Sequence, residues 1–86
     1  MIRDFAFLVP EGLAAEALVR AIRGADKSVI TGVRVFDRYQ PDGGELSLAI
    51  EVVLQPGAQS FTESEITEIS KRAIAAAEKL GATLRG

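Results

Sequence analysis

The 86-residue sequence contains no cysteine and no histidine. Thiolate and imidazole metal sites, iron–sulfur clusters, cysteine nucleophiles and histidine general bases are therefore excluded. No apolar run approaches the roughly 18 residues that a membrane-spanning helix requires. The start Met1-Ile2-Arg3-Asp4 becomes charged too early for a signal peptide. These absences predict a cytoplasmic domain that makes no membrane contact and lacks most of the chemistry of small enzymes.

The composition is that of a folded domain, with 48% hydrophobic and 26% charged residues. The length predicts one domain, residues 1–86, with one modest core. The formal net charge is −2, which counts against a nucleic-acid binder because phosphate affinity normally comes from clustered Lys and Arg. A domain that supplies one patch of a larger RNA interface can nevertheless be acidic overall.

Hydrophobic periodicity and turn signals divide the chain into six elements. The expected elements are a strand over 3–9, a helix from 13 that ends before Gly24, strands over 29–39 and 46–54, a helix from about 63, and a short strand over 82–85. Pro41-Asp42-Gly43-Gly44 predicts a hairpin between the middle strands, which Gln55-Pro56-Gly57 closes. Thr62 and Glu65 form a capping box at the start of the second helix. Gly81 is expected to end that helix in a left-handed conformation.

The order βαββαβ is typical of ferredoxin-like α+β domains. It predicts a four-stranded antiparallel sheet with both helices on one face, so that the other face is open. Alternation along 46–54 places Leu46, Leu48, Ile50, Val52 and Leu54 under the helices and Ser47 on the open face. Alternation along 29–39 does not choose a face. If Phe36 lies in the core, Asp37 and Tyr39 join Ser47, and Arg34 and Arg38 must reach past a sheet edge.

Four segments resemble one known family in the same order and at compatible spacing. They are Arg3-Asp4-Phe5-Ala6-Phe7, Phe36-Asp37-Arg38-Tyr39, Ser47-Leu48-Ala49 and the ending Gly81-Ala82-Thr83-Leu84-Arg85-Gly86. The sequence resembles the ferredoxin-fold anticodon-binding domain that closes the β subunit of bacterial phenylalanine–tRNA ligases. The ending resembles the end of that subunit, so we expect either an excised domain or a free-standing copy.

The resemblance implies an RNA-binding role without chemistry of its own. It implies that Tyr39 stacks on an anticodon base, and that Asp37 and Ser47 hydrogen-bond to base edges. An aromatic platform beside an acceptor and a hydroxyl suits a single-stranded loop, whose base faces and edges are exposed. Arg3 and Arg85 are on the first and last strands, which are neighbours in this topology, and are expected to contact phosphates or brace the sheet.

The family also implies partners. These are the tRNA anticodon stem-loop, the remaining domains of the ligase and its α subunit, or a homodimer if the chain stands alone. No cofactor is expected in this domain, because ATP and magnesium serve the catalytic centre elsewhere in the ligase. The chain departs from the family in two places. Many members carry one or more lysines just before the serine, where this chain has Gly44-Glu45-Leu46, and a basic residue is common at the position of Glu51. Both changes reduce phosphate attraction.

Two other functions fit the same fold. An acylphosphatase-like hydrolase needs a phosphate cradle after the first strand, and the acidic turn Pro10-Glu11-Gly12 disfavours it. A regulatory or dimerising module, which binds a small ligand or a twin across the open face or an edge strand, remains the alternative. Net acidity and Glu51 favour this alternative, whereas Asp37, Tyr39 and Ser47 favour RNA.

Overall fold

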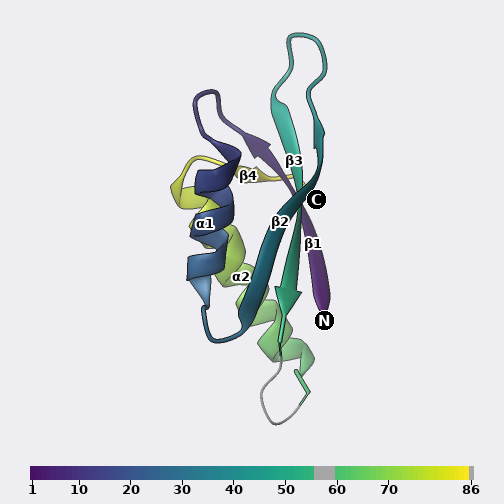
Figure 1. Ribbon diagram of the computed structural model, residues 1–86, viewed down its shortest axis with the longest axis vertical. Coiled ribbons are helices and arrows are strands. Elements are labelled where there is room, and N and C mark those ends of the chain that lie inside the picture. Colours follow the sequence, from purple (N-terminus) through teal and green to yellow (C-terminus); the bar gives the residue numbers. More distant parts are fainter. Residues whose placement is uncertain (56–59, 86) are drawn as a thin grey trace.

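The computed structural model describes residues 1–55 and 60–85 and shows four strands and two helices in the predicted order (Figure 1). The elements are β1 (Ile2–Val9), α1 (Ala15–Ala25), β2 (Ile30–Tyr39), β3 (Leu46–Leu54), α2 (Glu63–Lys79) and β4 (Thr83–Leu84). The predicted turn at Pro56 and Gly57 lies outside the described residues. Within the described ranges, no helix is long and apolar enough to cross a bilayer.

The strands form one antiparallel sheet in the order β2-β3-β1-β4. Both helices lie on the same side of this sheet (Figure 1), which leaves the opposite side open. This arrangement confirms the predicted ferredoxin-like fold. We call the helix-free side the open face.

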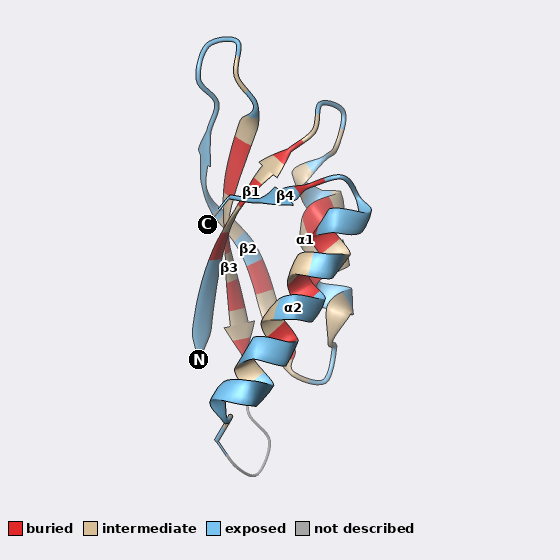
Figure 2. Ribbon diagram, turned by 180° about the vertical axis from the view of Figure 1, so that it is seen from behind, coloured by how far each residue is buried: buried red, intermediate tan, exposed pale blue. Residues whose placement is uncertain are grey.

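The core fills the space between the helices and the sheet, where Figure 2 shows the buried residues on the facing surfaces. Leu48, Ile50, Val52 and Leu54 are at most 1% exposed, as alternation along β3 predicts. The rings of Phe5 and Phe7 join them from β1, with centroids 6.1 Å apart. Burying each of these large side chains contributes about 1.5–3 kcal/mol.

The ends of α2 follow the sequence signals closely. Thr62 Oγ1 accepts a hydrogen bond from the Glu65 N–H (3.2 Å), and Glu65 Oε1 accepts one from the Thr62 N–H (3.1 Å), so the predicted capping box is confirmed. At the other end Gly81 has φ +93°, its N–H donates to the Glu78 carbonyl, and the Ala82 N–H donates to the Ala77 carbonyl. This pair of bonds is a Schellman motif, and it directs the chain into β4.

The predicted end of α1 was wrong by two residues. The helix continues through Gly24 and ends at Ala25. Glycine costs about 1 kcal/mol relative to alanine inside a helix, but the buried side chains of Leu18 and Ile22 hold this helix on the core. Tertiary packing therefore outweighs the local preference.

A bulge in β2 decides the position of Phe36, which alternation along the strand left open. Val35 is opposite Ile50 and Asp37 is opposite Ala49, so Phe36 is an extra residue in β2. Phe36 is 45% exposed and is not in the core. Because the extra residue reverses the alternation, Val33 and Val35 lie on the helix side, whereas Asp37 lies on the open face. A strand with regular alternation could not place Val33 and Val35 on the helix side and Asp37 on the open face.

Candidate nucleic-acid interface

Four rows of side chains cross the open face, because residues directly opposite each other in antiparallel strands share a face. From β1 through β3 to β2, the rows are Ile2–Val53–Gly32, Asp4–Glu51–Arg34, Ala6–Ala49–Asp37 and Leu8–Ser47–Tyr39. The sheet register therefore brings Asp37, Ser47 and Tyr39 together at one end of the open face, next to the β2–β3 hairpin. That hairpin is the loop at the top of Figure 1.

Tyr39 and Asp37 are available to a ligand. Tyr39 is 59% exposed, and its hydroxyl bonds to no described residue. Asp37 is exposed, and its Oδ1 accepts a hydrogen bond from the Arg38 backbone N–H (2.9 Å). That bond orients the carboxylate and leaves its second oxygen free of bonds to the described residues. The ring and the carboxylate can therefore both meet a molecule on the open face.

Ser47 lies on the expected side of the sheet, but it is only 6% exposed. Arg85 Nη1 donates a hydrogen bond to Ser47 Oγ at 3.1 Å. The Ser47 hydroxyl is therefore covered and engaged, unlike the freely accessible group that the strand alternation predicts. The exposed donor at this position is the guanidinium of Arg85.

β4 and the residue that follows it place Arg85. β4 pairs with β1 through Leu84 opposite Phe7 and Thr83 opposite Leu8. The Arg85 N–H extends this ladder by donating to the Ala6 carbonyl (2.6 Å). Arg85 is thereby set beside the Ala6 row, and its side chain reaches Ser47 two strands away from β4.

A shallow hollow lies between these groups. Its floor is formed by Ala6 and Ala49, which are directly opposite each other and whose methyl side chains leave room above the sheet. Asp37, Arg38, Tyr39, Ser47 and Arg85 form the rest of its lining. An aromatic ring, a carboxylate and a guanidinium thus surround a small apolar floor, an arrangement that can hold a planar, hydrogen-bonding ring system.

The neighbouring row, Asp4–Glu51–Arg34, holds two carboxylates and one cation, and that cation is paired. Arg34 Nε and Nη2 donate to the two carboxylate oxygens of Glu51 at 3.0 and 3.4 Å. The hydrogen bond and charge of Glu51 raise the pKa of Arg34 above its ordinary value. Arg85, by contrast, has no ionic partner among the described residues. Arg38, which also lines the hollow, is likewise in none of the ion pairs of the described chain. Arg85 and Arg38 are therefore the cations with which this site can attract an anion.

Arg3 is separated from this group. It lies opposite Val52 and so shares the face of the core residues, near the far end of β1. Arg85 lies beside Ala6 on the open face. The two strands are neighbours as expected, but the two arginines do not form one site.

Two features of the hollow were not anticipated from the sequence. The first is the alanine floor, for which the signal was the small side chain at a matching position in each central strand, Ala6 and Ala49. The second is the bond from Arg85 to Ser47, which depends on how a two-residue β4 pairs with β1. No group of three or more potential metal-binding His, Cys, Asp or Glu side chains occurs in the described part of the chain.

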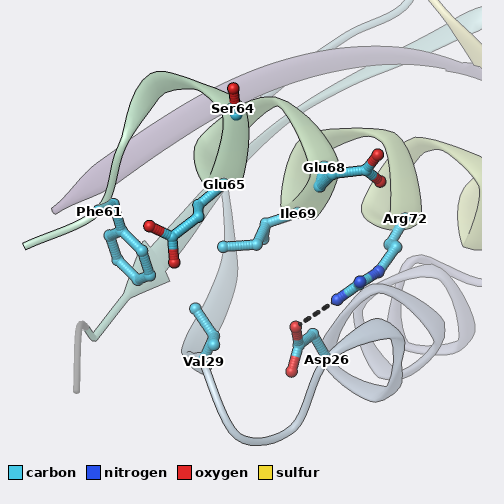
Figure 3. A pocket seen from close by; sticks show the side chains of 8 residues that line it. All are labelled: Asp26, Val29, Phe61, Ser64, Glu65, Glu68, Ile69 and Arg72. Atoms are coloured by element: carbon cyan, nitrogen blue, oxygen red, sulfur yellow. Dashed lines mark hydrogen bonds and ion pairs between the residues drawn. The ribbon is translucent and has the colours of Figure 1, made fainter.

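A different hollow lies between α2 and the connection from α1 to β2 (Figure 3). Three of its five polar residues, Asp26, Glu65 and Arg72, already serve the fold. Arg72 Nη1 donates to Asp26 Oδ2 at 2.8 Å, Ser28 Oγ donates to Asp26 Oδ1, and Glu65 belongs to the capping box. Val29 and Ile69 supply apolar walls (Figure 3). We interpret this hollow as the joint between α2 and the α1–β2 connection.

Comparison with known proteins gives a consistent result along the chain. The ferredoxin-fold anticodon binding domain family matches residues 1–85. The phenylalanine–tRNA ligase beta subunits of Zymomonas mobilis and Novosphingobium aromaticivorans are each 51% identical over 86 residues, covering 96% of this chain. The same subunit of Rhodospirillum rubrum is 47% identical over 87 residues.

The chain spans 11% of the length of each of these relatives, so it corresponds to one part of a much larger protein. The family match covers nearly every residue, and the fold and sheet order agree with it. The chain belongs to the ferredoxin-fold anticodon-binding domain family.

Proposed function

We propose that this domain binds the anticodon stem-loop of phenylalanine tRNA on its open face, as part of a phenylalanine–tRNA ligase beta chain. The observation that carries the proposal is the grouping of Tyr39, Asp37 and Arg85 around the Ala6–Ala49 floor. A hairpin loop offers unpaired bases with free faces and edges, which a duplex does not. The family and its ligase relatives support this RNA over other ligands.

Each side chain has a distinct role in this proposal. Tyr39 stacks on an unpaired base, an interaction worth about 1–3 kcal/mol. The free oxygen of Asp37 accepts a hydrogen bond from the edge of that base. Arg85 donates to a base acceptor or a phosphate, and Ser47 contributes by holding the guanidinium in place. Arg3 lies on the other face and is assigned no base contact.

The charge distribution sets the expected strength of binding. Arg34 is paired with Glu51, so Arg85 and Arg38, which both line the hollow, supply the phosphate contacts. With one or two neutralised phosphates, log K should fall with log salt at a slope of about −0.7 to −1.4 for single-stranded RNA. The isolated domain should therefore bind modestly, and specificity should come from stacking and base contacts.

The domain itself performs no reaction in this proposal. Phenylalanine activation, with its ATP and magnesium, belongs to the catalytic centre in the remaining domains and the alpha subunit of the ligase. We expect the assembled enzyme to be cytoplasmic and this domain to need no cofactor. Its contribution is to hold the anticodon end of the tRNA.

A low-salt binding titration tests the proposal. The 86-residue chain is titrated with a fluorescent anticodon stem-loop. The control RNA is a duplex in which paired nucleotides replace the loop, so that no nucleotide is unpaired. Preference for the stem-loop is expected, and a stem-loop with altered anticodon bases should bind more weakly. Equal affinity for the paired RNA would contradict an open face that receives unpaired bases.

A further inference from the structure

The open face carries a second hollow that adjoins the first. Tyr39, Ser47 and Arg85 line both hollows. The second hollow is completed by Leu8, Pro41 and Glu45, on the hairpin side of Tyr39. The exposed ring of Tyr39 and the guanidinium of Arg85 therefore border two separate spaces.

The lining of the second hollow has the chemistry of a base-binding site. Leu8 and Pro41 supply apolar surface. Glu45 is exposed, and its carboxylate makes no hydrogen bond or ion pair with the residues in 1–55 and 60–85. A free carboxylate accepts hydrogen bonds from the N–H groups of a base edge, but it repels a phosphate. The occupant that fits is a base whose phosphates lie outside the hollow.

The wall formed by Pro41 is held in place by the hairpin turn. The Gly44 N–H donates to the Pro41 carbonyl at 2.9 Å. A Cβ at Gly44 would lie 2.5 Å from Pro41 Cγ, so the absence of a side chain at Gly44 is what lets the proline ring pack there. The wall is thus formed before any ligand arrives, which reduces the entropy cost of binding.

We propose that the second hollow receives the nucleotide adjacent to the one that stacks on Tyr39. The open face then takes two consecutive unpaired nucleotides, with Glu45 reading the edge of the second base. Because the hollows share Tyr39, Ser47 and Arg85, a continuous strand can fill both without an intervening nucleotide. This inference rests on the proposed function and adds a second nucleotide to it.

The test combines Glu45→Ala with stem-loops in which each loop nucleotide in turn is replaced by an abasic one. Loss of one base hydrogen bond should weaken binding of the intact stem-loop about 3- to 10-fold. The Glu45→Ala penalty should vanish for the stem-loop that lacks one particular base, and the Tyr39→Ala penalty should vanish for the stem-loop that lacks another. These two bases should be adjacent in the loop. Gly44→Ala, which displaces Pro41, should give the same position dependence.

Asp42→Ala is the matched control, since Asp42 is an exposed carboxylate of the same turn that does not line the hollow. It should leave the affinity unchanged or raise it slightly, because it only removes like-charge repulsion. The proposal that the second hollow binds a nucleotide is overturned if Glu45→Ala binds as well as or more tightly than the parent chain, or if its penalty is equal for every abasic RNA. If Tyr39→Ala still weakens binding in that case, the proposed function stands without it, whereas loss of every position dependence overturns both.

Discussion

Arg85 Nη1 donates a hydrogen bond to Ser47 Oγ at 3.1 Å, and this bond joins the last described residue to the middle of the sheet. Ser47 is covered, whereas Arg85 is exposed. The serine therefore acts on a ligand through the guanidinium that it holds. From the sequence the two residues were expected to act separately, whereas this bond joins them into one unit.

Replacing Ser47 by alanine should weaken stem-loop binding about 3- to 10-fold, because the Arg85 guanidinium loses its anchor. Stability should fall by about 0.5–1.5 kcal/mol, the net worth of one hydrogen bond. Ser47→Thr keeps the hydroxyl and should retain most of the affinity. Titration and urea unfolding of both variants check this, and equal losses in Ser47→Ala and Ser47→Thr would point to packing and not to the hydrogen bond.

Glu51→Gln should strengthen RNA binding. The substitution removes the charge that neutralises Arg34 at 3.0 Å, so another cation becomes available on the open face. The slope of log K against log salt should steepen by about 0.7 if Arg34 then contacts one phosphate. The Arg34 side chain is 66% exposed and that of Glu51 is 22% exposed, so solvent screens their attraction and stability should change little. An unchanged salt slope would show that phosphates do not pass over this row.

Gly81→Ala and Gly24→Ala should change stability in opposite directions. Gly81 has φ +93°, and a Cβ there would lie 3.3 Å from Pro10 Cγ, so alanine should cost about 1–2 kcal/mol. A Cβ at Gly24 meets no atom within 4 Å, and alanine in this exposed helical position should add about 0.5–1 kcal/mol. Chemical unfolding compares the two variants with the parent chain. Destabilisation by Gly24→Ala would contradict the observed extension of α1.

Most of the fold follows from local signals in the sequence. Alternation along β3 identifies its buried face, and the Thr62 box and Gly81 mark the ends of α2. The face of β2 could not be predicted, because the extra residue at Phe36 reverses its alternation. The position of Asp37 on the open face depends on this bulge, which no local propensity indicates.

The candidate site is predictable only in part, because some of its contacts depend on how the strands pair and not on local sequence. Tyr39 and Ser47 come together because β2 and β3 form a hairpin, which the turn sequence indicates. Arg85 reaches Ser47 through the pairing of a two-residue β4 with β1, a contact between residues 38 positions apart. Arg3 and Arg85 are in or beside neighbouring strands, but Arg3 lies opposite Val52 and therefore on the face away from Arg85. Strand order alone does not decide which side chains meet.

The most direct measurement compares Tyr39→Ala with Phe36→Ala in titrations of the phenylalanine tRNA anticodon stem-loop. Both aromatic side chains are exposed on β2, at 59% and 45%, but only Tyr39 lines the hollows. Tyr39→Ala should weaken binding by about 1–3 kcal/mol with little change in stability, whereas Phe36→Ala should bind like the parent chain. Equal affinities of Tyr39→Ala and the parent chain would contradict the reading of unpaired bases on this face.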